Sequence, residues 1–254
     1  MSLLEVSGLC KTFGGLRAVD DVGFAVRSGA IKAVIGPNGA GKTTLFNLIF
    51  GSSIPDQGTV VFAGQKMEGG GPRQRVTVGM ARTFQHIRLF SQMTALENVM
   101  VGAHTRGRAG FLSSLFPLPR TWKEERFIRE QARAAMAFIG IEALADCDAT
   151  HLAYGEQRGV ELARALASKP RLLLLDEPAA GLNMRETVEL GKLIRRIRDD
   201  GVTILLVEHD MGLVMGISDE VVVLSQGQKI AEGGPLAVQK NPDVIRAYLG
   251  DEDA

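Results

Sequence analysis

Eight residues, GPNGAGKT at 36–43, constrain the fold of this chain more than any other stretch. They match the spacing G-x-x-x-x-G-K-[ST], follow the apolar run IKAVI at 31–35, and precede a helical pattern that ends at Gly51. Glycines in such a loop let backbone N–H groups approach phosphates, and the start of the next helix adds a partial positive charge. The stretch therefore predicts a phosphate-binding loop between a buried strand and a helix.

Within this loop, Lys42 is expected to reach the terminal phosphates of a nucleotide, and the Thr43 hydroxyl is placed to bind Mg²⁺. The residues predicted to contact the phosphates are Gly36, Pro37, Asn38, Gly39, Ala40, Gly41, Lys42, Thr43 and Thr44. A fortuitous glycine turn is the alternative, but the strand before the loop and the helix after it argue against one.

A second element of phosphate chemistry is LLLLDEP at 172–178. An apolar strand that ends in Asp176 delivers a carboxylate to the edge of the sheet where open α/β folds bind ligands. Asp176 is expected to hold Mg²⁺ through water, and Glu177 to accept a proton from the attacking water. An acidic pair after a strand often caps the following helix instead, so this prediction depends on the phosphate-binding loop.

Two single residues complete the predicted site. Gln85 in ARTFQHIRLF is a candidate to orient water and Mg²⁺, and His209, predicted to end the strand ILLVEH, is a candidate to touch the γ-phosphate. The alternative for each is an ordinary polar residue on a loop. The four histidines, at 86, 104, 151 and 209, have no metal-ligand spacing.

The pattern of apolar runs indicates an α/β fold. The runs at 31–36, 172–176 and 203–209 are continuously apolar or nearly so, as in strands covered on both faces of a parallel sheet. Short alternating runs near the N-terminus favour antiparallel strands. The predicted fold is a RecA-like P-loop NTPase core with a parallel sheet, a small antiparallel β subdomain and an inserted helical subdomain.

Bulk composition excludes several classes of protein. Lys plus Arg and Asp plus Glu both number 29, so no charge excess points to nucleic acid or to an anionic membrane surface. Cys10 and Cys147 lack metal-site or disulfide-framework spacing, which fits a reducing cytosol. No apolar run approaches the roughly 20 residues of a membrane helix, and the N-terminus does not read as a secretion signal. Any membrane role is therefore expected to come through a partner.

Taken in order, these motifs resemble the ATP-binding subunits of ABC transporters over essentially the whole chain. The resemblance adds Phe13 as the aromatic that stacks on adenine, LAYGEQ at 152–157 as the signature loop, and AAGLN at 179–183 as the D-loop. It implies ATP and Mg²⁺ as cofactors, with Thr43, Gln85 and Asp176 around the metal. Glu177, His209 and Gln85 are the implied catalytic residues. Ala153, Tyr154, Gly155 and Glu156 would face the ATP of a partner subunit.

GMARTFQHIRLFSQMTALENVMVGAH at 79–104 and NPDVIRAYLG at 241–250 narrow the resemblance to an ATPase of the bacterial importer for branched-chain amino acids. That implies a second, different ATPase, two transmembrane permeases and an extracytoplasmic binding protein as partners, and a peripheral place on the cytoplasmic face of the membrane. Importers of urea or short amides use similar ATPases and remain an alternative. A soluble ABC ATPase of DNA repair or translation usually has coiled coils, extra domains or fused cassettes, and the sequence contains none.

One domain is expected over 1–254, with residues 1–88 and 158–254 forming the core and 89–157 the helical subdomain. Residues 101–127 are rich in Gly, Arg and Pro and predict a long surface excursion. Its apolar segment at 111–119 either contacts the permeases or packs on the helical subdomain. The acidic end, DEDA at 251–254, is expected to fray.

Two departures from the family pattern predict unequal ATP sites. Ala153 replaces the signature serine whose hydroxyl would bond the partner's γ-phosphate, and Asn183 replaces the D-loop aspartate. A hydrogen bond to a charged group contributes about 1.5 to 3 kcal/mol. The site built on this chain's own phosphate loop is therefore expected to hydrolyse ATP, and the opposite site, which receives LAYGE, to turn over less.

Overall fold

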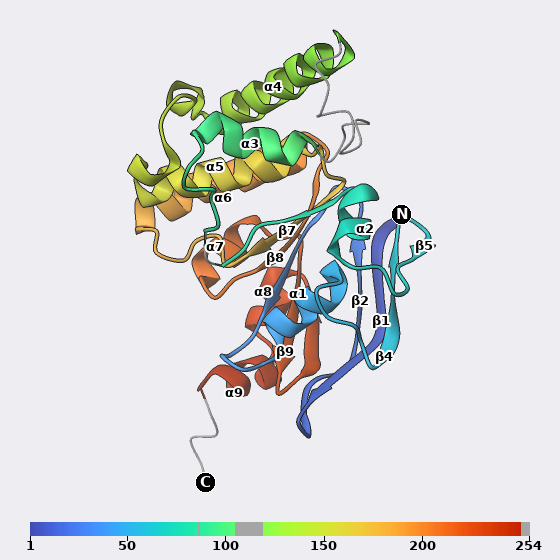
Figure 1. The fold of residues 1–254 in the computed structure, drawn as a ribbon. Helices are drawn as coiled ribbons and strands as arrows, with labels where there is room; N and C mark the ends of the chain where they lie inside the picture. The colour runs from blue at the N-terminus through green and yellow to red at the C-terminus, as the bar shows by residue number, and fades with distance from the viewer. Residues whose placement is uncertain (86, 105–118, 250–254) are drawn as a thin grey trace. The chain divides into compact units, whose positions relative to one another are not determined.

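The computed structural model describes residues 1–85, 87–104 and 119–249 (Figure 1). The chain divides into two compact units. The first, here called the core unit, comprises Met1–Arg82 and Arg171–Ala254, and the second, the helical unit, comprises Thr83–Pro170. No helix among the described residues is both long enough and apolar enough to cross a membrane.

A six-stranded sheet with the order β10-β9-β3-β8-β7-β6 forms the centre of the core unit (Figure 1). Its strands are β3 (Ile31–Ile35), β6 (Met80–Arg82), β7 (Leu172–Asp176), β8 (Thr203–Val207), β9 (Glu220–Ser225) and β10 (Gln228–Gly233). All neighbours are parallel except β9 and β10. Every residue of β3, β7 and β8 is buried, which confirms the parallel core expected from continuous apolar runs.

The N-terminal strands make a separate antiparallel sheet, also as expected. Its order is β2-β1-β4-β5, formed by β1 (Ser2–Phe13), β2 (Leu16–Arg27), β4 (Gln57–Phe62) and β5 (Gln65–Lys66). The two sheets share one hydrophobic cluster with α1 (Lys42–Phe50), whose Leu45, Phe46, Leu48 and Ile49 are fully buried. This packing fixes the helix that begins directly after the phosphate loop.

The remaining helices of the core unit are α2 (Pro72–Thr77), α6 (Met184–Asp199), α7 (Met211–Ile217), α8 (Pro235–Gln239) and α9 (Pro242–Leu249). The prediction that His209 ends a strand is wrong, because β8 stops at Val207. Glu208 and His209 lie in the connection to α7. The backbone N–H groups of His209 and Asp210 turn to the Glu208 carboxylate there, at 2.9 and 3.3 Å, instead of to a neighbouring strand.

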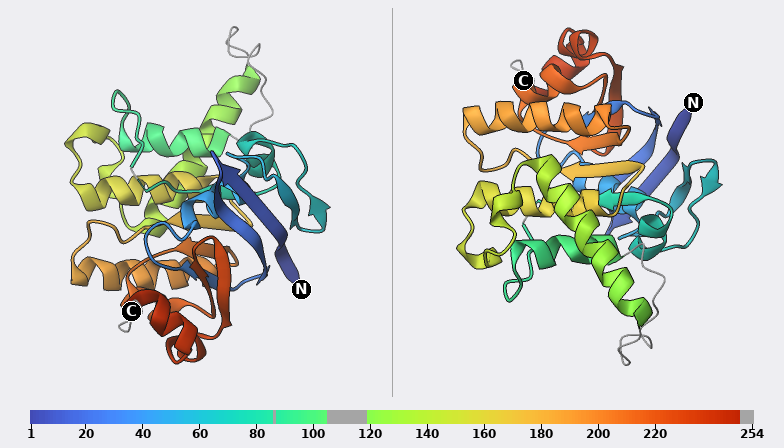
Figure 2. Two further views of the ribbon diagram at one scale, coloured as in Figure 1. Left: turned by 90° about the horizontal axis from the view of Figure 1, so that it is seen from below. Right: turned by 90° about the horizontal axis from the view of Figure 1, so that it is seen from above.

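The helical unit contains α3 (Ala95–His104), α4 (Pro119–Ile139) and α5 (Tyr154–Ala167), with short 3₁₀ turns at Glu142–Leu144 and Ala149–His151. The three helices pack side by side (Figures 1 and 2). Small residues such as Ala132, Ala163 and Ala167 fill their shared core.

The division of the chain differs from the sequence-based one. The sequence placed residues 158–170 in the core, whereas all of α5 belongs to the helical unit because Val160 and Ala163 pack against α3 and α4. Part of the expected excursion at 101–127 is helical instead, since α3 extends to His104 and α4 begins at Pro119. The rest of the excursion, with most of the segment at 111–119, lies outside the described residues, as does the acidic end.

Candidate functional site

The backbone of the loop at 36–43 requires glycine at two positions. Gly36 has φ 152°, and a Cβ there would lie 2.2 Å from the Leu224 carbonyl oxygen. Gly41 has φ 98° and immediately precedes α1, and its Cβ would lie 2.3 Å from the Ala18 carbonyl oxygen. Any side chain at either position would push the loop away from the strands behind it.

Lys42 is the first residue of α1, and its side chain folds back into the loop. Its Nζ donates to the carbonyl oxygens of Gly36 at 2.6 Å and Pro37 at 2.9 Å. Burial lowers the pKa of the Lys42 ammonium, and the negative charge of Glu177 opposes that shift. A buried cation is therefore held at the place where the terminal phosphates are predicted to bind.

A cavity of about 810 Å³ opens over this loop. It brings together parts of the sequence that are far apart, namely Phe13, Lys42 and Glu177. The complete lining is Phe13, Leu16, Arg17, Ala18, Asn38, Gly39, Ala40, Gly41, Lys42, Thr43, Thr44, Glu177 and Gln226. The cavity falls within the usual size of a small-molecule site, about 300 to 1,000 Å³.

Phe13, one of the lining residues, ends β1 and is half exposed. The Lys11 ammonium lies 5.5 Å from the centre of the Phe13 ring. An exposed aromatic face next to a phosphate-binding loop can stack on a planar base, and every base offers a π-face to it. The geometry therefore suits a nucleotide whose base meets Phe13 and whose phosphates meet Lys42.

Asp176 ends β7, but it does not line the cavity. Its side chain is buried, and its Oδ2 accepts from Arg82 Nη2 at 2.7 Å. The other arm of the same guanidinium, Nη1, donates to Asn47 Oδ1 on α1 at 2.8 Å. Glu177 follows with a left-handed backbone, φ 47°, and its N–H donates to the Val207 carbonyl at 2.9 Å.

Sequence reasoning missed Arg82 and Glu208. The Glu208 side chain is completely buried. Its Oε1 accepts the backbone N–H of Ala179 at 2.7 Å, and its Oε2 accepts that of His209 at 2.9 Å. One carboxylate thus joins the loop after Glu177 to the loop that carries His209. A charged residue that extends an apolar run was the only signal in the sequence for either residue.

His209 and Asn183, two further predicted residues, lie outside the cavity lining. The His209 side chain is 62% exposed, and its Nδ1 is 3.8 Å from Glu208 Oε2. Asn183 caps α6: its Oδ1 accepts the Glu186 N–H at 3.1 Å, and Glu186 Oε2 accepts the Asn183 N–H at 2.9 Å. The amide at position 183 therefore has a structural role at the start of that helix.

The other predicted residues belong to the helical unit. Gln85 is exposed, shortly after β6. Ala153 occupies the N-cap position of α5 and Tyr154 is the first helical residue, so the expected helix begins within the predicted signature loop. The Ala153 N–H donates to Glu156 Oε2 at 2.8 Å. The Tyr154 hydroxyl accepts from Arg158 Nη2 at 2.9 Å.

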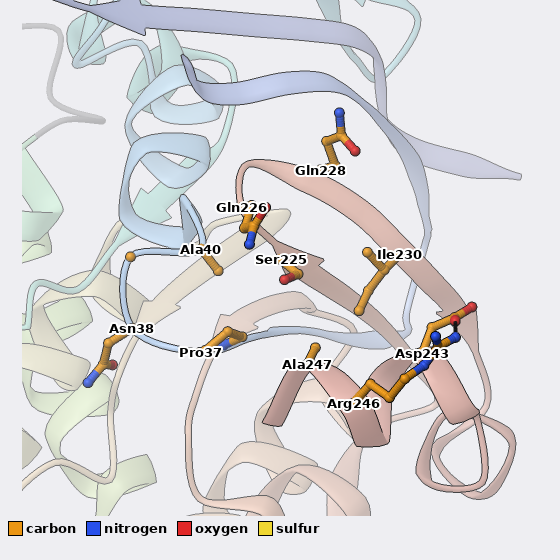
Figure 3. A pocket seen from close by; sticks show the side chains of 11 residues that line it. Pro37, Asn38, Ala40, Ser225, Gln226, Gln228, Ile230, Asp243, Arg246 and Ala247 are labelled. Carbon is orange, nitrogen blue, oxygen red and sulfur yellow. Dashed lines mark hydrogen bonds and ion pairs between the residues drawn. The ribbon is translucent and has the colours of Figure 1, made fainter. Parts of the chain in front are cut away.

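A second hollow of about 730 Å³ also borders the phosphate loop (Figure 3). Asn38, Ala40 and Gln226 border both hollows, whereas Asp243, Arg246 and Ala247 of α9 border only this one. Arg246 is ion-paired with Asp243 (Figure 3). Neither Lys42 nor Glu177 lines this hollow, so the first cavity is the better candidate for a nucleotide site.

Among the residues that the structure describes, no three His, Cys, Asp or Glu side chains gather as a metal cluster would. Mg²⁺ commonly uses only one or two protein oxygens together with phosphates and water. Thr43, which carries a hydroxyl, lines the cavity, and Asp176 at the end of β7 carries a carboxylate outside the cavity lining. This sparse set of oxygen donors fits Mg²⁺ carried by a nucleotide.

Comparison with known proteins agrees with this geometry. A family model described as ABC transporter matches residues 19–180, and one described as branched-chain amino acid ATP-binding cassette transporter matches residues 228–254. The chain is 46% identical over 250 residues to the high-affinity branched-chain amino acid transport ATP-binding protein LivG of Salmonella typhimurium, covering 98% of each. It has the same identity, length of match and coverage with BraF of Pseudomonas aeruginosa.

A solved structure gives the same result for the fold. The crystal structure of the ADP conformation of an ATP-binding cassette from an ABC transporter aligns with a TM-score of 0.86 and 32% identity, covering 99% of this chain and 100% of that one. The resemblance and the fold class expected from the motifs are both confirmed. The chain belongs to the ABC transporter family, as one of its ATP-binding cassettes.

Proposed function

We propose that this chain is the ATP-binding and hydrolysing subunit of an ABC importer for branched-chain amino acids. The observation that supports this most directly is the cavity in which Phe13, Lys42 and Glu177 meet over the phosphate loop. The substrate class is supported by the names of the relatives, because this chain itself is not expected to touch the transported molecule. ATP hydrolysis would then drive uptake.

In the bound state, the backbone of Gly36–Thr44 surrounds the phosphates and Phe13 stacks on adenine. Lys42 exchanges its contacts with the Gly36 and Pro37 carbonyls for the terminal phosphates. A phosphate oxygen outcompetes a neutral carbonyl for an ammonium, because the phosphate adds the attraction between opposite charges to the hydrogen bond. Before a nucleotide binds, the contacts with the two carbonyl oxygens keep the Lys42 ammonium at the site.

Mg²⁺, when bound with ATP, neutralises phosphate charge. We assign Thr43, Gln85 and Asp176 to hold it, Asp176 through water. Oδ2 of Asp176 accepts from Arg82, so Oδ1 would be the oxygen that acts toward the metal. Gln85 would contribute its side-chain carbonyl oxygen.

Glu177 is the proposed general base for the attacking water, and His209 the proposed contact to the γ-phosphate. Glu177 lines the cavity, and its charge acts on the Lys42 ammonium. A carboxylate beside the reacting phosphate can act as a general base in ATP hydrolysis, because it accepts the proton that the attacking water releases. His209 lies on the loop that Glu208 holds in place.

The partner set follows from the same proposal. A second, different ATPase would face this chain, so that residues 153–156 meet the partner's ATP. Two transmembrane permeases would hold the pair at the cytoplasmic face of the membrane, and an extracytoplasmic protein would deliver substrate. Ala153 offers no hydroxyl to the opposite phosphate, whereas the start of α5 still offers backbone N–H groups and its dipole. The opposite site is therefore the weaker one.

Two experiments test the proposal. In the assembled transporter, Glu177→Gln should abolish or strongly reduce ATP hydrolysis while ATP binding persists, and full turnover would refute the assignment of the base. In a deletion strain, restored uptake of leucine, isoleucine and valine supports the substrate class. Restored uptake of urea alone would assign the chain to a short-amide importer instead.

A further inference from the structure

Side chains of helix α5 form hydrogen bonds with backbone groups of the segment that follows β6. The Glu161 Oε1 accepts the Phe84 N–H at 3.3 Å, and Arg158 Nη1 donates to the Phe84 carbonyl at 3.2 Å. Arg164 Nη1 donates to the Arg88 carbonyl at 2.7 Å. Both backbone groups of the residue before Gln85 are therefore bound by side chains of one helix.

The Arg158 guanidinium also contacts the first residue of α5. Arg158 Nη2 donates to the Tyr154 hydroxyl at 2.9 Å, and the guanidinium carbon lies 5.5 Å from the centre of the Tyr154 ring. Tyr154 and Arg158 are four residues apart, so they face each other on the helix surface. Arg158 therefore contacts the predicted signature loop with one arm and the Gln85 segment with the other.

Burial makes this arrangement rigid. The side chains of Arg158 and Glu161 are 6% and 1% exposed, and Arg158 Nη1 lies 3.5 Å from Glu161 Oε2. A buried charge that loses its partner is costly, because water cannot replace the lost contact. The pair therefore has few alternative positions while α5 stays folded.

We propose that Arg158 is a positioning residue that fixes the Gln85 segment relative to the signature loop at 153–156, with Tyr154 as its anchor and Glu161 as its counter-charge. This inference rests on the proposed function. There Gln85 serves this chain's own ATP and residues 153–156 serve the partner's, so Arg158 links the two ATP sites within one chain. Tyr154, at a position where the family usually has glycine, gains a defined purpose: its hydroxyl is the acceptor for Arg158.

The test uses the assembled transporter with Tyr154→Phe and Arg158→Lys, each with wild-type Gln85 and with Gln85→Ala. Phenylalanine removes only the hydroxyl of Tyr154. Lysine keeps the positive charge of Arg158 but lacks the two-armed guanidinium that donates to the Tyr154 hydroxyl and the Phe84 carbonyl at once. With Gln85 present, kcat for ATP hydrolysis should fall about threefold to tenfold, the equivalent of one net hydrogen bond, with KM for ATP unchanged. With Gln85→Ala, neither variant should cause a further loss.

Arg126→Lys is the matched control, because Arg126 is exposed on α4 and pairs only with Glu130 among the contacts described. Equal losses with and without Gln85 would mean that Arg158 acts on the fold and not through Gln85, and no loss at all would also overturn the proposal.

Hydrogen exchange provides a readout that does not depend on activity. Because Arg158 holds the Glu161 carboxylate that accepts the Phe84 N–H, Arg158→Lys should speed exchange in a peptide covering 83–90 and leave one covering 170–178 unchanged. Unchanged exchange at 83–90 would overturn the proposal. A complex that never hydrolyses ATP would refute the proposed function, whereas exchange at 83–90 still reports on the Arg158 contact.

Discussion

Arg82 Nη2 lies 2.7 Å from Asp176 Oδ2, and both side chains are buried. Because Arg82 also holds Asn47 on α1, this one guanidinium joins β6, β7 and the helix that follows the phosphate loop. The ring of Phe46 lies 5.8 Å from the same guanidinium carbon. The carboxylate assigned to the metal is thus fixed by a residue three positions before Gln85.

Replacing Arg82 by methionine should destabilise the protein strongly. The change leaves Asp176 buried without its cation, and breaking a buried pair in this way costs about 3 to 5 kcal/mol. Urea unfolding followed by circular dichroism measures the free energy directly. Arg82→Lys, which keeps the charge, should recover part of the loss. An unchanged urea midpoint in Arg82→Met would show that the ion pair contributes nothing to folding.

Glu208→Gln should slow ATP hydrolysis while ATP binding is retained. The amide has only one oxygen where the carboxylate uses two, so either Ala179 or His209 loses its acceptor. A hydrogen bond to a charged group is worth about 1.5 to 3 kcal/mol. Turnover and nucleotide binding would be measured in the same complex. Glu189→Gln, at an exposed residue that pairs with Lys192, is the control, and equal turnover in both variants would exclude this role for Glu208.

Local patterns were sufficient to predict the parallel core and the glycine-rich loop between a buried strand and a helix. Glycine spacing and continuous apolar runs are properties of neighbouring residues, and they need no knowledge of the tertiary structure. Arg82 and Glu208 could not be assigned in that way. Each has a role only because folding brings a distant partner to it: Asp176 for Arg82, and Ala179 for Glu208.

Tyr154 illustrates a different kind of omission. The sequence analysis placed it only among the signature-loop residues that would face a partner's ATP, although its spacing from Arg158 is that of two residues on one helix face. The division between the units was also beyond sequence reading. The apolar face of α5 predicts that the helix packs against something, but it does not say that α3 and α4 are the partners.

The contribution of Glu161 to stability should depend on pH. Burial raises the pKa of this carboxyl above its ordinary value of 4.5, opposed mainly by the Phe84 N–H and the charge of Arg158. A raised pKa means that folding favours the protonated form, so this contribution is complete below pH 4.5 and is lost as the pH rises through the folded pKa.

The difference in free energy of unfolding between the wild-type protein and Glu161→Gln, measured by urea titration, should therefore be larger at pH 4 than at pH 7. Groups common to both proteins cancel in this difference. A difference that stays constant, or grows toward pH 7, would contradict the shift.

Ala153→Ser should raise turnover at the opposite ATP site. A serine at the N-cap of α5 would complete a capping box with Glu156, whose carboxylate already accepts the N–H of residue 153. The cap itself should add about 1 kcal/mol of stability, and the new hydroxyl would face the partner's γ-phosphate. Hydrolysis is best followed in a complex whose Glu177→Gln change silences this chain's own site.

Aspartate at the same position separates the two effects. Ala153→Asp should stabilise α5 as serine does, but its negative charge should repel the phosphate and lower turnover. Ala134→Ser, exposed on α4, controls for adding a hydroxyl elsewhere in the helical unit. If serine and aspartate raise turnover equally, the gain comes from the stability of the helix, and the missing hydroxyl does not explain the weaker site.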